Sequence, residues 1–372
     1  MFQKMKIAVI GCGMISDIYL KNLKNFDVVD LVGCADIRAE RAKEKAEAYQ
    51  IQAMTNQEIY DDPEISLVVN LTYPTSHYTV AKEALLAGKH VYTEKMMVAT
   101  MEEADELLAM AKEKQLFCGG APDTFFSASF QLARQILDSG ILGTPTTAEI
   151  FLSRDYRHER WNCAPYKRFA FCPAGGIPFD MGAYYFSALV FLLGSVKRAG
   201  GIAEIREPER YFQHPNSPLF EQEMRVESFN QAVGTLQFTN GTLASVAFTS
   251  EGGTTSNRFV IHCTDGCIDL GDPNNYESCV TIKNKAGEES VIHSNFAFHS
   301  GNFRGVGIAD AIYALQNNRP ARCSGDLCRH VLEIARAICY SDGKIVELST
   351  EVARPAPLAT GYTEYPELVF RR

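Results

Sequence analysis

The sequence feature that most constrains the fold is a short apolar run that leads into a pair of glycines. Residues 6–10 are mostly apolar and β-branched, which predicts a buried strand. Gly11 and Gly13 flank the turn expected next, and a helix is expected directly after it. A second apolar run, residues 28–35, ends at Asp36. This order of strand, glycine turn, helix, strand and acid predicts a dinucleotide site, the alternative being a βαβ unit that binds no phosphate.

Each part of the turn has an expected role in holding a pyrophosphate. Gly11 permits the tight turn, and Gly13 lets the backbone approach the phosphates. Backbone N–H groups at the helix start, around Met14 and Ile15, would face the phosphate charge. Ser16 replaces the third glycine of the usual fingerprint, and a residue this small still allows the helix to pack on the strand.

Asp36 and Arg38 bear on the choice between NAD and NADP. Asp36 lies roughly 20 positions past the second glycine, where an acid is expected to meet the ribose hydroxyls. Its carboxylate would repel the 2′-phosphate of NADP, so NAD is favoured and NADP is less favoured. Arg38 lies two residues further on and could soften this preference.

Strand and helix patterns alternate over residues 6–121, which predicts a parallel sheet with right-handed crossovers. One of the expected helices covers residues 36–49. Ligands bind such sheets beyond the carboxyl ends of the strands. The candidate cofactor-binding residues in the loops at that edge are Thr72, Tyr73, Pro74, His77, Glu94 and Lys95. For His77, a place beside the nicotinamide and a helix-capping role are both open.

The second half of the chain changes from alternation to a series of short strand-like runs. Asn240 and Gly241 between two of them are a hairpin signal. One strand is expected over residues 226–238 and one long apolar helix over 180–193. The pattern predicts an α+β domain with an open, mostly antiparallel sheet. The expected organisation is a Rossmann domain (1–122), an α+β domain (123–350) and an extended arm (351–372).

Composition limits the remaining classes of function. Of the 372 residues, 46% are hydrophobic and 22% are charged, as in an ordinary globular protein. A net charge of −9 argues against a nucleic-acid partner, and no run approaches the roughly 20 apolar residues of a membrane span. The N-terminus has no apolar signal core. The 11 cysteines are scattered and odd in number, which indicates reduced thiols and a cytoplasmic protein.

Taken together, these landmarks resemble the Gfo/Idh/MocA family, the glucose–fructose oxidoreductase and inositol dehydrogenase group. The motifs that carry the resemblance are the glycine turn, residues 87–91 leading to Glu94-Lys95, Gly175-Gly176 before Asp180-Met181-Gly182, and Arg304-Gly305. The resemblance implies a nicotinamide cofactor and oxidation of a secondary alcohol on a sugar, polyol or related ring. It also implies a C-terminal sheet that forms an oligomer interface, hence a homodimer or homotetramer.

Two positions depart from the family pattern. The usual Glu-Lys-Pro is Glu-Lys-Met here, because Met96 replaces the proline. The family's histidine four residues past the aspartate is Tyr184, so the identity of the catalytic base stays open. The first departure bears on the geometry of the loop after Lys95.

Hydride transfer from an alcohol needs a group that takes the hydroxyl proton and a cation near the oxygen. Lys95 is the candidate cation, with a surface ion pair to Glu94 as the alternative. Asp180 and Tyr184 are spaced (i, i+4), on one face of the expected helix. A tyrosine titrates near pH 10 unless an ammonium group lowers its pKa, so a Tyr184–Lys95 pair is chemically reasonable. The alternatives are a packing or substrate-binding role for Tyr184 and an N-cap role for Asp180.

A loop rich in basic and aromatic residues carries the candidate substrate-binding residues Arg157, His158 and Trp161. Aromatic faces suit sugar rings, and arginines suit hydroxyls or anions. The alternative is an exposed loop with a local tryptophan anchor. His158, Cys163 and Cys172 match no standard zinc spacing, so no metal is expected.

Three functions fit this site. The first is an NAD-dependent oxidoreductase acting on a ring hydroxyl of a sugar, cyclitol or glycoside. The second is an enzyme that retains NAD and works as a lyase or epimerase through a transient keto-sugar, which net NADH formation from a single substrate would distinguish. The third is a non-catalytic dinucleotide-binding sensor, against which the presence of Lys95 and Asp180 argues.

Overall fold

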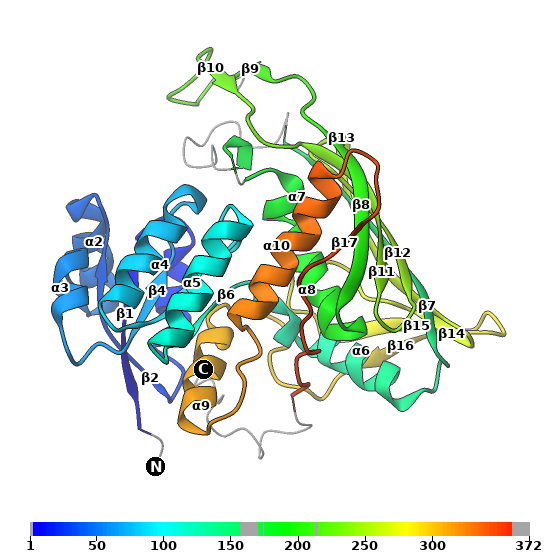
Figure 1. Ribbon diagram of the computed structural model, residues 1–372, viewed down its shortest axis with the longest axis horizontal. Coiled ribbons are helices and arrows are strands. Elements are labelled where there is room, and N and C mark those ends of the chain that lie inside the picture. The colour runs from blue at the N-terminus through cyan, green and yellow to red at the C-terminus, as the bar shows by residue number, and fades with distance from the viewer. Residues whose placement is uncertain (1–2, 157–169, 174, 213–214, 359–372) are drawn as a thin grey trace. The chain divides into compact units, whose positions relative to one another are not determined.

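Two units make up the chain in the computed structural model (Figure 1), and we call them the first and the second unit. The structure describes residues 3–156, 170–173, 175–212 and 215–358. The first unit contains residues 1–126, 295–329 and 358–372, and the second contains residues 127–294 and 330–357.

The first unit is built on a six-stranded parallel sheet of order β3-β2-β1-β4-β5-β6. Its strands are β1 (Met5–Ile10), β2 (Val29–Ala35), β3 (Gln52–Ala53), β4 (Leu67–Asn70), β5 (His90–Thr93) and β6 (Cys118–Gly120). The order reverses at β1, which pairs with β2 on one side and with β4 on the other. In such a sheet the ligand crevice opens at the carboxyl ends of the strands beside this reversal.

Helices connect these strands, as the alternating pattern predicts. They are α1 (Ser16–Leu23), α2 (Ala39–Tyr49), α3 (Asn56–Asp61), α4 (His77–Leu86) and α5 (Met101–Glu113). Helix α9 (Val306–Gln316), from the late part of the chain, belongs to the same unit but connects none of these strands. Helix α2 begins at Ala39, so the expectation that it starts at Asp36 is wrong. The Asp36 carboxylate accepts the backbone N–H groups of Cys12 and Arg38, which holds this residue in the loop.

Residues 295–329 group with the first unit, although the expected domain boundary assigns them to the C-terminal domain. The Asp123 carboxylate accepts the N–H groups of Gly305 and Gly307 at 2.8 and 3.0 Å, at the start of α9. The Asn22 amide donates to the carbonyl oxygens of Asn302 and Arg304. These contacts are long-range in the sequence, which is why the pattern of strands and helices does not reveal them.

The second unit is built on a nine-stranded sheet of order β16-β15-β14-β13-β7-β12-β11-β8-β17. Its strands are β7 (Pro145–Asp155), β8 (Val196–Glu204), β11 (Gln231–Phe238), β12 (Leu243–Thr249), β13 (Glu251–Cys263), β14 (Gly266–Asp269), β15 (Cys279–Asn284), β16 (Glu289–His293) and β17 (Val346–Glu347). All pairings are antiparallel except that of β12 with β7. The predicted fold class, a Rossmann unit with an open, mostly antiparallel sheet, is confirmed.

Helix α8 (Gly182–Leu193) forms the centre of the second unit's core, and all its residues are buried. Its sequence is apolar on every side, which is typical of a fully buried helix. Tyr185 packs on Phe248 and Phe259 of the sheet with ring centroids 5.6 and 5.8 Å apart. The other helices of this part are α6 (Ala128–Ser139), α7 (Ile177–Asp180) and α10 (Gly325–Tyr340), the last of which spans residues of both units.

Two expected elements are interrupted in the structure. The helix expected over 180–193 begins at Gly182, as α8, because Asp180 is the last residue of the separate short helix α7. The strand expected over 226–238 begins only at Gln231, as β11, and residues 226–230 lie in no strand. The residues before them form β10 (Glu223–Arg225), which pairs with β9 (Glu209–Tyr211). Strand β8 has no counterpart among the expected elements. An apolar pattern identifies buried segments but does not show where tertiary contacts end them.

Candidate cofactor and active site

The glycine turn after β1 needs glycine at its first position. Gly11 has φ +106°, and its N–H donates to the carbonyl of Ala35 at 2.8 Å. A Cβ added there would lie 2.6 Å from the carbonyl carbon of Leu71, at the end of β4. The turn is therefore packed between the ends of β2 and β4, at the point where the strand order reverses.

The second glycine faces open space. A Cβ added to Gly13 would meet no atom within 4 Å among the described residues. Ser16 is buried, and its hydroxyl donates to the Gly13 carbonyl at 2.6 Å, which explains how serine serves in place of the third glycine. Met14 is 54% exposed and Ile15 is the N-cap of α1, with no side-chain cap. The start of α1 thus has the open backbone that suits a pyrophosphate.

Asp36 is fixed at the end of β2 by both of its carboxylate oxygens. One accepts the N–H of Cys12 and the other accepts the N–H of Arg38, each at 2.8 Å. The carboxylate is half-buried beside the turn, whereas Ile37 and Arg38 are exposed. A fixed acid at this place suits the hydroxyls of a ribose.

Two buried polar residues connect the loops that follow β4 and β5. The Asn70 amide donates to the His77 carbonyl at 2.9 Å, and its oxygen accepts the Thr72 hydroxyl at 2.7 Å. The His77 ring lies 2.7 Å from the Met96 carbonyl through Nδ1 and 3.0 Å from the Thr72 carbonyl through Nε2. His77 opens α4, and its buried ring faces backbone oxygens on both sides. Tyr73 and Pro74 lie at the more open rim of the same loop.

The pH dependence of stability is expected to report on His77. Burial lowers the pKa of this imidazole, against the effect of the Met96 and Thr72 carbonyls, which raise it. The unfolded chain, with a histidine pKa near about 6.5, therefore takes up the proton first. Stability from neutral His77 is present above about pH 6.5 and is lost as the pH falls through the lower folded pKa, by at most about 1.4 kcal/mol per pH unit.

Urea unfolding of the wild type and of His77→Gln at several pH values measures this effect. We expect the variant to lose about 1–3 kcal/mol at neutral pH, because buried polar groups lose their partner, and to show a flatter slope below pH 6.5. Exposed His293, replaced by Gln, is the matched control and should leave the slope unchanged. Equal slopes for His77→Gln and the wild type would contradict the assignment.

Lys95 follows β5 in a loop whose backbone is held by the preceding residue. The Lys95 N–H donates to the Glu94 carboxylate at 3.1 Å, and the other carboxylate oxygen accepts the Tyr19 hydroxyl at 2.6 Å. Glu94 is buried and Lys95 is half-buried. The peptide bond between Lys95 and Met96, where the family has proline, is cis.

Asp180 and Tyr184 lie in the second unit, on either side of the break between α7 and α8. The Asp180 N–H donates to the Gly176 carbonyl at 2.7 Å, and Tyr184 is buried. Asp180 ends α7 and is not the N-cap of α8, which is Met181. Gly176 has φ +78°, and a Cβ there would lie 2.5 Å from the Phe229 carbonyl oxygen, which explains the second glycine of the pair before this helix.

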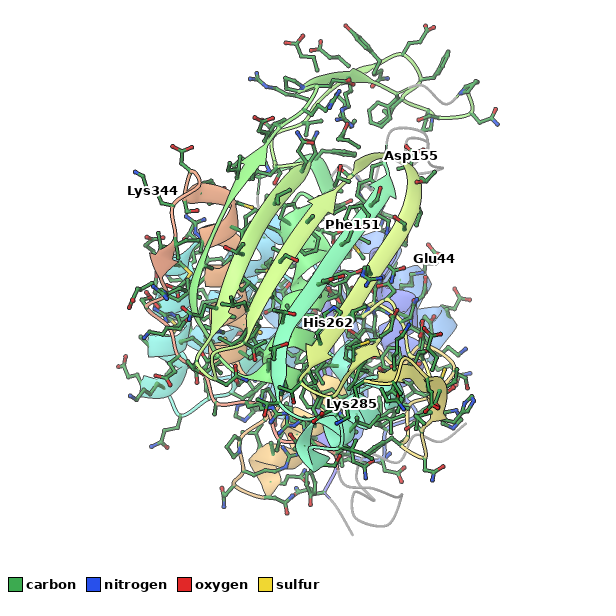
Figure 2. All side chains as sticks on the ribbon, turned by 90° about the vertical axis from the view of Figure 1, so that its right-hand side faces the viewer. Glu44, Phe151, Asp155, His262, Lys285 and Lys344 are labelled. Carbon is green, nitrogen blue, oxygen red and sulfur yellow. The ribbon has the colours of Figure 1, made fainter. Side chains whose placement is uncertain are left out.

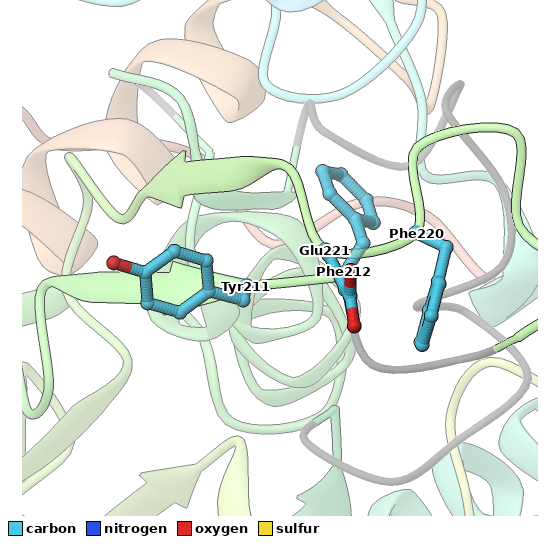
Figure 3. A pocket seen from close by; sticks show the side chains of 4 residues that line it. All are labelled: Tyr211, Phe212, Phe220 and Glu221. Carbon is cyan, nitrogen blue, oxygen red and sulfur yellow. The ribbon is translucent and has the colours of Figure 1, made fainter.

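The substrate loop falls outside the described residues, and this includes Arg157, His158 and Trp161. A shallow pocket of about 430 Å³ in the second unit is lined by Tyr211, Phe212, Phe220 and Glu221 (Figure 3). None of the predicted site residues within the described part of the chain lines it. Among the residues that the structure describes, no group of three potential metal ligands occurs.

Sequence reasoning did not single out three residues that support the site: Tyr19, Asn70 and Asp123. Asn70 is the one polar residue of β4, and this signal was available in the sequence. Tyr19 and Asp123 are paired with residues far along the chain, so no local pattern marks them.

Two family models match the chain and together cover more than half of it. One, described as "Oxidoreductase family, NAD-binding Rossmann fold", matches residues 5–119. The other, described as "GFO/IDH/MocA C-terminal domain", matches residues 130–269. With the glycine turn and the parallel sheet, these matches define an oxidoreductase with an NAD-binding Rossmann domain. The chain belongs to the Gfo/Idh/MocA family, which confirms the predicted family and cofactor.

Similar proteins include a myo-inositol 2-dehydrogenase and a levoglucosan dehydrogenase. The uncharacterized oxidoreductase YrbE of Bacillus subtilis is 25% identical over 66% of this chain and 67% of its own length. The myo-inositol 2-dehydrogenase of Thermotoga maritima is 24% identical over 65% of this chain and 67% of its own. The structure of a levoglucosan dehydrogenase in complex with NADH has the same fold, with TM-score 0.80, 18% identity, and coverage of 94% of this chain and 100% of that one. Within the described residues, no helix is long and apolar enough to cross a membrane.

Proposed function

We propose that the protein transfers hydride between a secondary ring hydroxyl of a sugar, cyclitol or glycoside and the nicotinamide of NAD. The observation that carries the proposal is the position of Lys95. It follows β5 at the edge of the sheet where the glycine turn follows β1, and Glu94 holds its backbone. The match to a myo-inositol 2-dehydrogenase supports the substrate class.

The residues of the first unit fit a bound dinucleotide. Open space at Gly13 and the free start of α1, with Met14 and Ile15, would take the pyrophosphate. Asp36 would take the ribose hydroxyls and favour NAD over NADP. The loop of Thr72, Tyr73 and Pro74 would lie towards the nicotinamide. When bound, NAD accepts the hydride.

The chain's own residues would supply the proton chemistry. The Lys95 ammonium would stabilise negative charge on the substrate oxygen. Tyr184 is the proposed base for the hydroxyl proton, and Asp180 the residue that orients the substrate. Arg157, His158 and Trp161 are proposed to bind the sugar ring.

A panel of sugars, inositols and glycosides with NAD or NADP, followed by the absorbance of the reduced cofactor, tests the function. We expect net NADH from at least one polyol, with NAD at least about tenfold better than NADP, the equivalent of about 1.4 kcal/mol. Asp36→Ser should reduce that preference, whereas Asp30→Ser, at the opposite end of β2, should not. Activity only with acids that lack a hydroxyl would contradict the substrate class. An epimer or elimination product without net NADH would favour the NAD-retaining alternative.

We further propose that the outer face of the second unit's sheet joins two or more copies of the chain. Figure 2 shows this face, on which the labelled Phe151 lies. Paired residues form a row across the strands: Ile202 opposes Val233, Val233 opposes Ala247, and Ala247 opposes Phe151. Ile202, Val233 and Phe151 are 62%, 63% and 40% exposed. An apolar row of this kind suits burial against a second copy.

A charge placed in this row is expected to dissociate the oligomer. Val233→Glu would leave an unpaired carboxylate in the interface, which costs more than the contact itself contributes. Sedimentation measures the mass of wild type and variant at equal concentration. Ile141→Glu, at a position that is also apolar and highly exposed but lies outside the sheet, is the control. An unchanged oligomer in Val233→Glu, or a monomeric wild type, would contradict this interface.

A further inference from the structure

Glu94 is placed between the helix that follows the glycine turn and the proposed catalytic lysine. We propose that Tyr19 is a positioning residue, which through Glu94 fixes the backbone at Lys95 relative to α1. The consequence for turnover rests on the proposed function, whereas the consequence for the loop does not.

Both carboxylate oxygens of Glu94 and its backbone N–H form hydrogen bonds. One carboxylate oxygen accepts the Tyr19 hydroxyl at 2.6 Å, and the other accepts the Lys95 N–H at 3.1 Å. Tyr19 is fully buried and Glu94 is 7% exposed. The Glu94 N–H itself donates to the Asn70 carbonyl at 2.9 Å, so this residue is also tied to the end of β4.

The surroundings of the Tyr19 hydroxyl keep it protonated, so that it donates its hydrogen bond to the Glu94 carboxylate. Burial, together with the neighbouring carboxylates of Glu94 and Asp123, raises the pKa of the Tyr19 phenol well above its usual value. The hydroxyl therefore keeps its proton at every working pH and donates to the carboxylate. A buried carboxylate oxygen without such a donor is strongly disfavoured, so Glu94 would turn towards other donors or water if the hydroxyl were removed.

Because Tyr19 lies on α1, its hydrogen bond to Glu94 joins this helix to the loop that carries Lys95. Tyr19 lies one turn into α1, whose first residues are proposed to face the pyrophosphate. Lys95 is proposed to act at the other end of the same dinucleotide. The hydrogen bonds through Glu94 therefore connect the element that would bind the phosphates with the element that would carry the reacting ammonium. A small displacement of a reacting group costs orders of magnitude in rate, so this connection matters for turnover.

Single-residue hydrogen exchange on the full chain tests the inference without a substrate. In Tyr19→Phe we expect the Lys95 amide to exchange roughly tenfold faster, because its acceptor is released. The Glu94 amide, bonded to Asn70, is the internal reference. Tyr92→Phe is the matched control, since Tyr92 is equally buried and its hydroxyl does not donate to Glu94, whose partner is Tyr19. Glu94→Gln, which leaves one acceptor oxygen for two donors, should speed exchange at Lys95 as Tyr19→Phe does.

Turnover with a substrate from the panel supplies the second measurement. We expect Tyr19→Phe to lower kcat roughly ten- to a hundredfold while the KM for NAD changes less than threefold, and Tyr92→Phe to preserve kcat. Unchanged exchange at Lys95 in both Tyr19→Phe and Glu94→Gln would overturn the inference, as would equal effects of Tyr19→Phe and Tyr92→Phe. Faster exchange in a protein that oxidises no polyol would leave the positioning role in place and count against the proposed function alone.

Discussion

Replacement of Lys95 by methionine is expected to lower kcat about 10²- to 10³-fold, because the substrate oxygen loses the cation proposed to stabilise its charge. Methionine keeps much of the length of the side chain, so the half-buried site stays filled. The Kd for NADH, measured by fluorescence titration, should change less than threefold. A lower kcat with an unchanged Kd for NADH would show that the substitution affects the chemical step and not cofactor binding.

Lys82 provides the control for this experiment. It lies on α4 in the same unit and pairs with Glu106 at 2.6 Å on the surface. Lys82→Met should leave kcat within twofold, because a surface ion pair contributes little to stability. A Lys95→Met protein with full turnover would remove the lysine from the mechanism. A Lys95→Met protein that no longer binds NADH would assign it to the cofactor instead.

Alanine at the two glycines of the turn is expected to have different effects: Gly11→Ala should lower stability, and Gly13→Ala should lower NADH affinity. Gly11→Ala places a Cβ 2.6 Å from the Leu71 backbone at φ +106°, and such strain costs about 1–3 kcal/mol of stability. Gly13→Ala meets no protein atom within 4 Å of its Cβ, so its melting temperature should match that of the wild type. Its methyl group would instead occupy the space proposed for the pyrophosphate. We expect NADH affinity to fall at least about tenfold, or 1.4 kcal/mol.

Thermal unfolding and NADH titration of both variants check this contrast. A Gly13→Ala protein that binds NADH as tightly as the wild type would show that the phosphates do not approach this turn. A Gly11→Ala protein of full stability would show that the turn adapts to a side chain, contrary to the packing against Leu71.

The first unit followed closely from its sequence. The strand at residues 6–10, the glycine turn and the buried strand of β4 are local patterns, and local hydrophobic periodicity predicts such elements well. Serine in place of the third glycine was also interpreted correctly, since Ser16 is buried and bonded to Gly13. The start of α2 was wrong because the Asp36 side chain binds backbone N–H groups in the loop. Helix propensity does not take account of a hydrogen bond between a side chain and the backbone of a loop.

The supports of the site could not be predicted in the same way. His77 was expected either beside the nicotinamide or as a helix cap, and the structure adds that its ring is buried between the Thr72 and Met96 carbonyls. The partner of Glu94 is Tyr19, a contact across 75 positions of sequence. Hydrogen bonds over such separations depend on how the strands are ordered in the sheet, which the sequence pattern leaves open.

By itself, the sequence determined the order of elements, the glycine turn with its acid, the family and the NAD-binding domain. These depend on short-range periodicity and on residues with one special conformational or chemical property. Only the tertiary structure decided that Asp123 fixes residues 305 and 307, that Asn70 and His77 join two loops, and that Glu94 is shared by Tyr19 and Lys95. The physical reason is that a buried polar group must find a partner wherever packing places one, and that place is fixed by the whole fold.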